Sequence, residues 1–309
     1  MDKVRLLQQA EGKPRAGVIP SEGLDLKALG VLTALALFWG GNSVAMKIAL
    51  RYMEPFILAG LRFTISLAGV IAWAKLRGVG LRARADELPH LIALGVCFAA
   101  QISTFNIGTD LSLASRSSLF INTHPFFVAI LAHFLIPTDR LRPVKVLGLA
   151  SAFLGVFLTL RENLLSSTSY MRGDLILILS ALILGVQSIY TKRIVQRVDP
   201  AKILAWQMGV GVVLFYLLSL IFEEPGGWRV SGELILAVAY QGLLVGIFCF
   251  LIWVTLLRRY SASKLSAFLF TTPIFGVMLS RLILGERLSL WLGAGAALVG
   301  LGIYLVNRS

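Results

Sequence analysis

The chain has 309 residues, of which 57% are hydrophobic and only 15% are charged, and its formal net charge is +13. Soluble globular domains are typically ~45–50% apolar and ~25% charged, and disordered chains are more polar still. The composition therefore excludes both classes and predicts a protein embedded in a lipid bilayer.

Apolar runs of membrane-spanning length follow one another along the chain. A helix needs about 20 apolar residues to cross the hydrocarbon core of a bilayer. Ten such runs can be drawn, at 27–50, 55–75, 88–109, 113–136, 143–161, 173–192, 201–222, 233–257, 264–284 and 288–307. The connections between them are too short for a soluble domain. The sequence predicts an all-α, polytopic membrane protein with ten transmembrane helices.

The basic side chains gather at alternate ends of these runs. With the N-terminus in the cytoplasm, 20 of the 29 Lys and Arg residues fall on the cytoplasmic side and seven on the outside. Because cytoplasmic loops carry an excess of Lys and Arg, both termini are predicted to be cytoplasmic. Residues 1–26 are polar and basic and are predicted to be a cytoplasmic extension rather than a signal peptide. The positive charge then reflects orientation in the bilayer, and no nucleic-acid partner is expected.

The second half of the sequence repeats the first. A shift of 145 residues aligns Lys47 with Lys192, and a shift of 148 aligns Pro125 with Pro273. A shift of 147 aligns two further glycines in each half, Gly148 with Gly295 and Gly155 with Gly302. Each half holds five runs, an odd number, so the copies must cross the membrane in opposite directions. Inverted repeats of this kind recur in secondary transporters, where they enclose a central site.

Several segments resemble a known family. These are FWGGNSVAMK at 38–47, ASRSSLFINTHPFF at 114–127 and ASKLSAFLFTTPIF at 262–275. They resemble the EamA-like repeat of the drug/metabolite transporter superfamily, and the general plan of the chain is similar to that of the YddG-type amino-acid exporters. The resemblance implies two five-helix repeats around a cavity lined chiefly by the first, third, fourth, sixth, eighth and ninth spans. It predicts a first repeat over 27–161, a connecting loop over 162–172 and a second repeat over 173–309.

Neutral polar and aromatic side chains within the apolar runs are the candidate substrate-binding residues. A polar group in hydrocarbon is costly unless it is paired or faces a wet cavity. The set predicted to contact substrate is Trp39, Asn42, Ser43, Gln101, Phe105, Asn122, Gln187, Trp253 and Thr271. The alternative interpretation is that the polar members pair between helices and the aromatic members pack in the core.

Two prolines and three basic residues have other predicted roles. Pro125 and Pro273 lie within runs and predict kinks that serve either gating or packing. Lys47 and Lys192 lie at opposite membrane faces and are candidates for gate contacts, with snorkelling to the interface as the alternative. Arg62 lies about two turns into the second run, where we favour a structural hydrogen bond over contact with a substrate anion.

The acidic residues bear on the coupling mechanism. None of the 16 Asp and Glu residues lies in the interior of a run, which argues against a cation pump built on a buried carboxylate. His124 is the candidate for proton coupling. The alternative is that its ring donates a hydrogen bond to backbone freed by Pro125. Facilitated diffusion driven by the substrate's own gradient is the competing mechanism.

Signatures of catalysis and cofactor binding are missing from the sequence. It contains two cysteines, no metal-ligand spacing and no phosphate-binding loop. We therefore expect no enzyme, no cofactor, no metal site and no ATP-binding domain. The predicted function is export of small metabolites, most of all amino acids and among these aromatic or apolar ones, by alternating access across the cytoplasmic (inner) membrane of a bacterium. A monomer suffices for this function. Open alternatives are transport of drugs, nucleotide sugars or organic anions, and a membrane sensor or enzyme without net flux.

Overall fold

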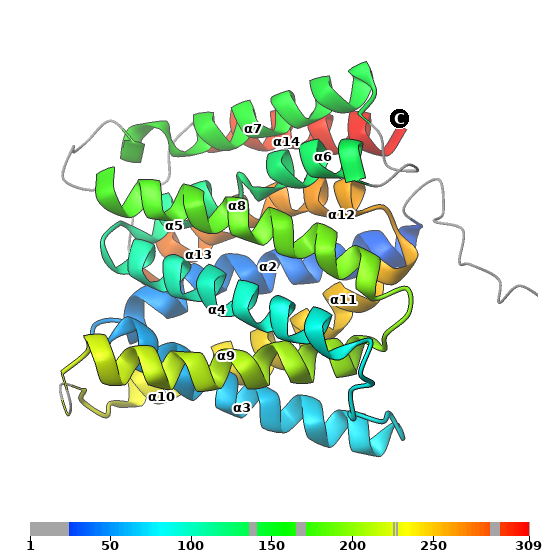
Figure 1. Cartoon of the computed structure of the whole chain (residues 1–309). Coiled ribbons are helices and arrows are strands. Elements are labelled where there is room, and N and C mark those ends of the chain that lie inside the picture. The colour runs from blue at the N-terminus through cyan, green and yellow to red at the C-terminus, as the bar shows by residue number, and fades with distance from the viewer. Residues whose placement is uncertain are drawn as a thin grey trace, which may run out of the picture.

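The computed structural model describes residues 25–135, 141–164, 171–224, 226, 228–284 and 291–308. Within these ranges every regular element is a helix, and the helices lie side by side in one bundle (Figure 1). The first half contributes α2 (Leu26–Ala49), α3 (Pro55–Leu76), α4 (Leu88–Asp110), α5 (Ala114–Ile121), α6 (His124–Leu135) and α7 (Pro143–Leu164). The second contributes α8 (Met171–Ile194), α9 (Pro200–Phe222), α10 (Gly232–Ala239), η2 (Tyr240–Cys249), α11 (Phe250–Arg259), α12 (Ala262–Phe268), η3 (Leu269–Thr271), α13 (Thr272–Leu284) and α14 (Trp291–Arg308).

The described helices include membrane spans by length and composition. Seven continuous helical stretches are long and apolar enough to cross a bilayer. Shorter apolar helices occupy His124–Leu135, Pro143–Gly155 and Ala297–Val306, within the three remaining predicted runs. The protein is therefore a multi-pass, all-helical membrane protein.

Helix starts follow local sequence signals. The Asp25 carboxylate accepts the Ala28 N–H at 2.7 Å and begins α2, and Asp199 accepts the Ala201 N–H at 2.8 Å and begins α9. These contacts satisfy backbone donors that have no partner within the helix. The start of α3 is held from another element, because the Glu223 carboxylate accepts the N–H groups of Phe56 and Ile57 at 2.5 and 2.9 Å.

The two predicted spans that contain the prolines depart from a regular α-helix in different ways. The run at 113–136 divides into α5 and α6, and Pro125 is the second residue of α6. Likewise Pro273 is the second residue of α13, which follows α12 and a single 3₁₀ turn. Proline is tolerated in the first turn of a helix, where its missing N–H would have no partner in any case. Pro125 therefore begins a new helix, whereas Pro273 follows a 3₁₀ turn within a helical stretch that runs without a break from Ala262 to Ile283.

The last helices of the two halves, α7 and α14, cross at glycines. A Cβ atom on Gly148 would lie 2.8 Å from the Gly302 carbonyl oxygen, and one on Gly155 would lie 2.6 Å from the Gly295 oxygen. Because the residue order reverses between the two contacts, the helices are antiparallel. Small residues allow this close backbone approach.

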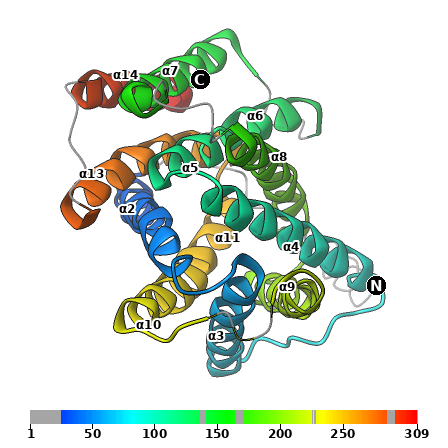
Figure 2. The ribbon, with the colours of Figure 1, turned by 90° about the vertical axis from the view of Figure 1, so that its left-hand side faces the viewer.

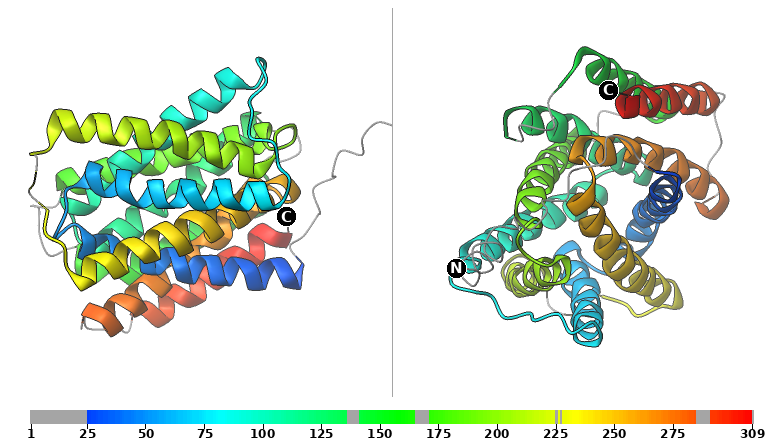
Figure 3. Two further views of the ribbon diagram at one scale, coloured as in Figure 1. Left: turned by 90° about the horizontal axis from the view of Figure 1, so that it is seen from below. Right: turned by 90° about the vertical axis from the view of Figure 1, so that its right-hand side faces the viewer.

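The remaining helices form a ring, with α7 and α14 packed on one side of it (Figure 2). The view from the opposite end shows the same arrangement, with helices of both halves alternating around the centre (Figure 3). Aromatic rings fill part of the interior: Phe63 lies 4.7 Å from Phe98, 5.9 Å from Phe215 and 6.1 Å from Phe250, measured between ring centroids. This packing leaves a cavity beside it.

Candidate functional site

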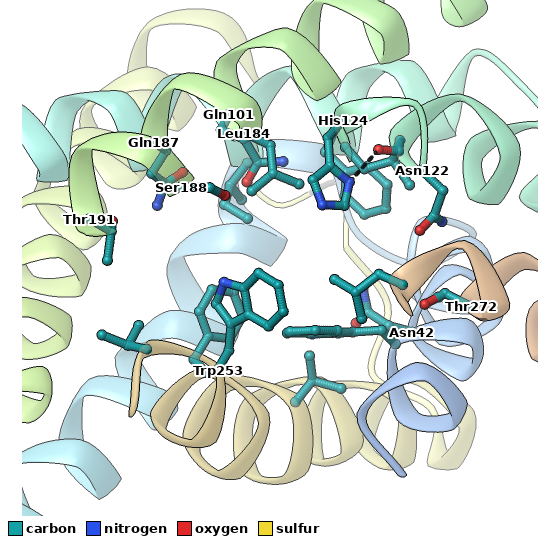
Figure 4. Close-up of a pocket in the computed structure, with 18 of the residues that line it drawn as sticks. Asn42, Gln101, Asn122, His124, Leu184, Gln187, Ser188, Thr191, Trp253 and Thr272 are labelled. Carbon is teal, nitrogen blue, oxygen red and sulfur yellow. Dashed lines mark hydrogen bonds between the residues drawn. The ribbon is translucent and has the colours of Figure 1, made fainter. Parts of the chain in front are cut away.

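A cavity of about 140 Å³ lies at the centre of the ring and is lined by residues from both halves. A cavity of ~150 Å³ in a protein interior holds one benzene molecule, so this one has room for part or all of a small metabolite. Figure 4 shows Gln187, His124 and Asn122 on one side of the space and Trp253 on the other.

The structure brings together eight of the nine residues predicted to contact substrate. They are Trp39, Asn42, Ser43, Gln101, Phe105, Asn122, Gln187 and Trp253. Thr271 does not line the cavity, and its neighbour Thr272 does. The Thr271 hydroxyl instead donates to the Phe268 carbonyl at 2.9 Å, as the Thr123 hydroxyl does to the matched Phe120 carbonyl at 2.7 Å. Both threonines thus stabilise the broken turn that precedes a proline.

One wall of the cavity is aromatic. The rings of Trp39 and Trp253 meet edge to face, with centroids 5.5 Å apart and an interplanar angle of 77°. Trp39 also meets Phe250 at 6.3 Å in the same geometry. Such a wall offers an apolar surface to a ligand side chain.

The amide side chains of the cavity differ in whether their polar atoms have hydrogen-bond partners. The Gln101 side chain donates to the Ser180 hydroxyl at 3.1 Å, and the Asn122 side chain donates to the Ser118 carbonyl at 2.6 Å. By contrast, the buried side-chain oxygens of Asn42 and Gln187 have no hydrogen-bond partner within the part of the chain that the structure describes. Since buried acceptors are normally paired, these two oxygens are free to accept from a ligand.

The His124 side chain compensates for the proline that follows it. Its ring Nδ1 lies 3.1 Å from the Ile121 carbonyl oxygen, to which it donates. In an uninterrupted helix that carbonyl would receive the N–H of residue 125, which proline lacks. The second ring nitrogen is not needed for this contact, and His124 also lines the cavity.

Lys47 and Lys192 lie outside the cavity lining and cap helix ends. The Lys47 ammonium donates to the carbonyls of Thr109, Asp110 and Ser112 at 3.0, 2.9 and 2.7 Å. Pro125 and Pro273 also lie outside the lining, at the helix starts described above.

Sequence reasoning did not place four polar residues in the cavity: Arg62, Thr191, Gln207 and Gln241. Arg62 was expected to be structural because the resemblance placed the second span away from the cavity. Its guanidinium donates to Gln241 Oε1 at 2.7 Å and to Asn106 Oδ1 at 3.4 Å. The two glutamines are polar residues within apolar runs, and this signal alone could have found them.

The charge of the cavity is one-sided. None of the described residues that line the cavity is Asp or Glu. Among these residues, Arg62 alone carries a formal positive charge. A ligand that carries a negative group and an apolar part would complement this surface.

Comparisons with known proteins agree with these features. The profile of the EamA-like transporter family matches residues 26–161 and again 171–308. An uncharacterized transporter of Bacillus subtilis, YoaV, is 25% identical over 279 residues, which cover 90% of this chain and 95% of that protein. A protein of Escherichia coli named "Probable amino-acid metabolite efflux pump" is 27% identical over 290 residues, covering 89% and 93% of the two chains.

A solved crystal structure has the same fold. It aligns with a TM-score of 0.76 at 25% identity, over 91% of this chain and 98% of the other. The two profile matches correspond to the two halves that enclose the cavity. The chain belongs to the EamA-like transporter family, within the drug/metabolite transporter superfamily, and is a multi-pass membrane transporter.

Proposed function

We propose that the protein exports amino acids and related amphipathic metabolites across the cytoplasmic (inner) membrane of a bacterium. The observation that carries the proposal is the central cavity, which combines free amide oxygens, one cation and an aromatic wall, without an acidic residue among its described lining. An amino acid offers matching parts: an ammonium donor, a carboxylate and a side chain. Relatives in Escherichia coli and Salmonella typhimurium are named probable amino-acid metabolite efflux pumps, which supports this substrate class.

We further propose ten transmembrane helices in two inverted repeats with both termini in the cytoplasm. Support comes from the seven long apolar stretches together with the three shorter ones. The antiparallel crossing of α7 and α14 fits two halves of opposite orientation, and the distribution of Lys and Arg fits cytoplasmic termini. One chain encloses the cavity, so a monomer suffices for transport.

In this proposal the two halves tilt against each other and expose the cavity to one side at a time. The break between α5 and α6 and the 3₁₀ turn between α12 and α13 are two matched places where the regular α-helix is interrupted. The amide oxygens of Asn42 and Gln187 receive donors of the substrate, while Trp39 and Trp253 contact its side chain. Because His124 bonds to the Ile121 carbonyl, we propose transport down the substrate gradient without proton coupling.

The test is efflux from proteoliposomes. Vesicles containing the protein and loaded with radiolabelled leucine or phenylalanine should lose label faster than protein-free vesicles, with the same initial rate whether or not a pH gradient is imposed. The variant Asn42→Leu should lose most of this flux. Equal efflux from vesicles with and without protein would refute the proposal. Strict dependence on the pH gradient would refute the uncoupled mechanism alone and restore His124 as the coupling residue.

The alternatives give different results in the same assay. Flux of drugs or nucleotide sugars with none of the amino acids would identify another transporter of this superfamily. Ligand binding without flux would identify a sensor or an enzyme.

A further inference from the structure

We infer that Arg62 and Gln241 form a carboxylate-binding site at one end of the cavity, and that the substrates are amphipathic monocarboxylates held chiefly by this group. The inference rests on the proposed function and names the part of the substrate that the cavity recognises. It is carried by the contacts of Arg62, which the sequence led us to regard as structural.

Arg62 is a buried charge without a counter-charge. Its side chain is only 3% exposed and lies in the eighth position of α3, within a predicted span. Among the described residues it makes no ion pair; its guanidinium contacts two neutral amide oxygens and the face of Phe63, 4.6 Å from the ring centroid. Burying a cation in this way is costly, and arginines within membrane spans mark substrate and ion pathways. A substrate anion would neutralise it.

Two donors of the same cluster lack acceptors. Arg62 Nε and Gln241 Nε2 are both buried and have no hydrogen-bond partner within the described residues. Gln241 already accepts from Arg62 through Oε1, so its amide nitrogen is left over. A carboxylate is acceptor-only, has two oxygens and pairs with guanidinium in charge-assisted hydrogen bonds. A carboxylate supplies the kind of acceptor that both donors lack.

The backbone holds this pair in place. Gln241 is the second residue of η2, a π-helical segment, and π-helical turns occur frequently at functional sites. The Ser66 hydroxyl lies 2.9 Å from the Arg62 carbonyl oxygen and 2.8 Å from that of Gly242. A Cβ atom on Gly242 would lie 3.1 Å from the Arg62 carbonyl oxygen, so glycine lets α3 and η2 approach closely.

The rest of the cavity limits the ligand to a single negative charge. With one formal cation in the described lining, a dianion such as a phosphate monoester would leave one charge uncompensated in an apolar site. An ammonium group meets only neutral amide oxygens there. Loss of the amino group should therefore weaken binding less than loss of the carboxylate.

The first experiment compares matched ligands on the full-length protein in lipid nanodiscs. Binding is measured by calorimetry for L-leucine, isocaproate, leucinamide and isoamylamine, which differ in the carboxylate and the amine around one side chain. We expect leucine and isocaproate to bind at least about tenfold more tightly than leucinamide and isoamylamine. A phenylalanine series and phenyl phosphate are measured in parallel. Equal affinity across the four leucine compounds, no binding by any carboxylate, or tightest binding by phenyl phosphate would each overturn the inference.

The second experiment uses two variants and a matched control. Gln241→Glu places a carboxylate beside Arg62 and should reduce isocaproate binding at least about tenfold while the melting temperature stays the same or rises. Arg62→Gln should bind leucine and leucinamide equally. Gln196→Glu makes the same substitution at an exposed residue outside the cavity and should leave binding unchanged.

A merely structural role for Arg62 predicts another pattern. In that case Arg62→Gln would weaken leucine and leucinamide by the same factor, and Gln241→Glu would retain isocaproate binding; either result overturns the inference. If Arg62→Gln does not fold, Gln241→Glu decides alone. Amino-acid efflux can fail while isocaproate still binds through Arg62, which would refute the proposed function and leave the inference standing. If efflux persists but binding shows no preference for carboxylates, the inference is refuted and the proposed function stands.

Discussion

Lys47 and Lys192 occupy matched positions in the two halves, and each ammonium caps the C-terminal end of a matched helix. Lys47 contacts the carbonyls of the last two residues of α4 and of Ser112 just beyond it, and Lys192 donates to the carbonyls of Leu257 and Tyr260 at 2.6 and 2.7 Å, at the end of α11. The C-terminus of a helix carries partial negative charge and unpaired carbonyls. A lysine ammonium offsets this charge and donates hydrogen bonds to these carbonyls. The repeat has thus preserved a helix cap in each half.

Removal of either ammonium should destabilise the fold. Lys47→Met and Lys192→Met should each lower the free energy of unfolding by about 1.5–3 kcal/mol, the range for hydrogen bonds to charged groups. Thermal unfolding in detergent measures this, with Lys75→Met at an exposed site as the control. A faster transport rate with unchanged stability would contradict the capping role and favour a gate contact instead.

Glu87 gives the protein a pH-dependent contact outside the spans. Its carboxylate accepts the Arg84 backbone N–H and the Lys202 ammonium, each at 3.0 Å, and these contacts hold its pKa below the ordinary value of 4.5. A lowered pKa means that the stabilisation is complete above the ordinary pKa and is lost as the pH falls through the lowered one. The melting temperature of Glu87→Gln should therefore lie below that of the parent near neutral pH and converge with it in acid.

The neighbouring Asp86 supplies the control for this titration. Its side chain is 70% exposed and pairs with Arg84, which is also exposed, so Asp86→Asn should change stability little at any pH. A difference between the parent and Glu87→Gln that persists unchanged at low pH would show that the carboxylate charge is not responsible.

The edge-to-face pair of Trp39 and Trp253 should set the size of the ligand side chain. Trp253→Ala removes one ring of the wall and should weaken leucine binding about two- to tenfold, on the scale of the ~0.5–1.5 kcal/mol that an aromatic contact contributes beyond the area it buries. Bulkier amino acids should lose less affinity than leucine does. Trp228→Ala, at a half-exposed tryptophan outside the cavity, is the matched control. Equal losses for all side-chain sizes would argue against a wall that contacts the ligand.

The crossing of α7 and α14 should tolerate no added methyl group at its contact point. A Cβ atom on Gly302 would lie 2.5 Å from the Gly148 carbonyl oxygen, so Gly302→Ala must push the helices apart and should cost about 1–3 kcal/mol. On the same helix nothing lies within 4 Å of a Cβ atom at Gly300, and Gly300→Ala should be neutral. Chemical or thermal unfolding compares the two variants. Equal melting temperatures would contradict the close contact.

Sequence patterns identified much of the cavity because polar residues in apolar runs are few, and each needs a hydrogen-bond partner or a wet cavity. Asn42, Gln101 and Gln187 were identified on that ground alone, and all three line the cavity. Arg62 was expected to make a structural hydrogen bond, and its contacts with Gln241 and Asn106 agree with that expectation. Its place in the cavity lining was not expected, because the family resemblance placed its span at the periphery. Gln241 was overlooked although it is a polar residue in an apolar run; its contact with Arg62, at the start of a π-helical segment, is not revealed by hydrophobic periodicity.

The helix breaks show a second limit of sequence reasoning. A proline within a long apolar run is compatible with a kinked helix or with two separate helices, and composition does not choose between them. Here Thr123 and His124 both bond to carbonyls of the preceding turn, and these side-chain contacts stabilise the interruption. Such contacts depend on rotamers that only the structure provides.

The glycine contacts between α7 and α14 have a consequence for assembly. Gly148 meets the copy of Gly155, and Gly155 meets the copy of Gly148, so exchanging the halves reproduces the same pair of contacts. That reciprocity defines an isologous interface, in which one surface is complementary to itself about a two-fold axis. The interface between the two halves of this chain thus has the symmetry of a homodimer interface, and a single half carries both of the contacting glycine positions.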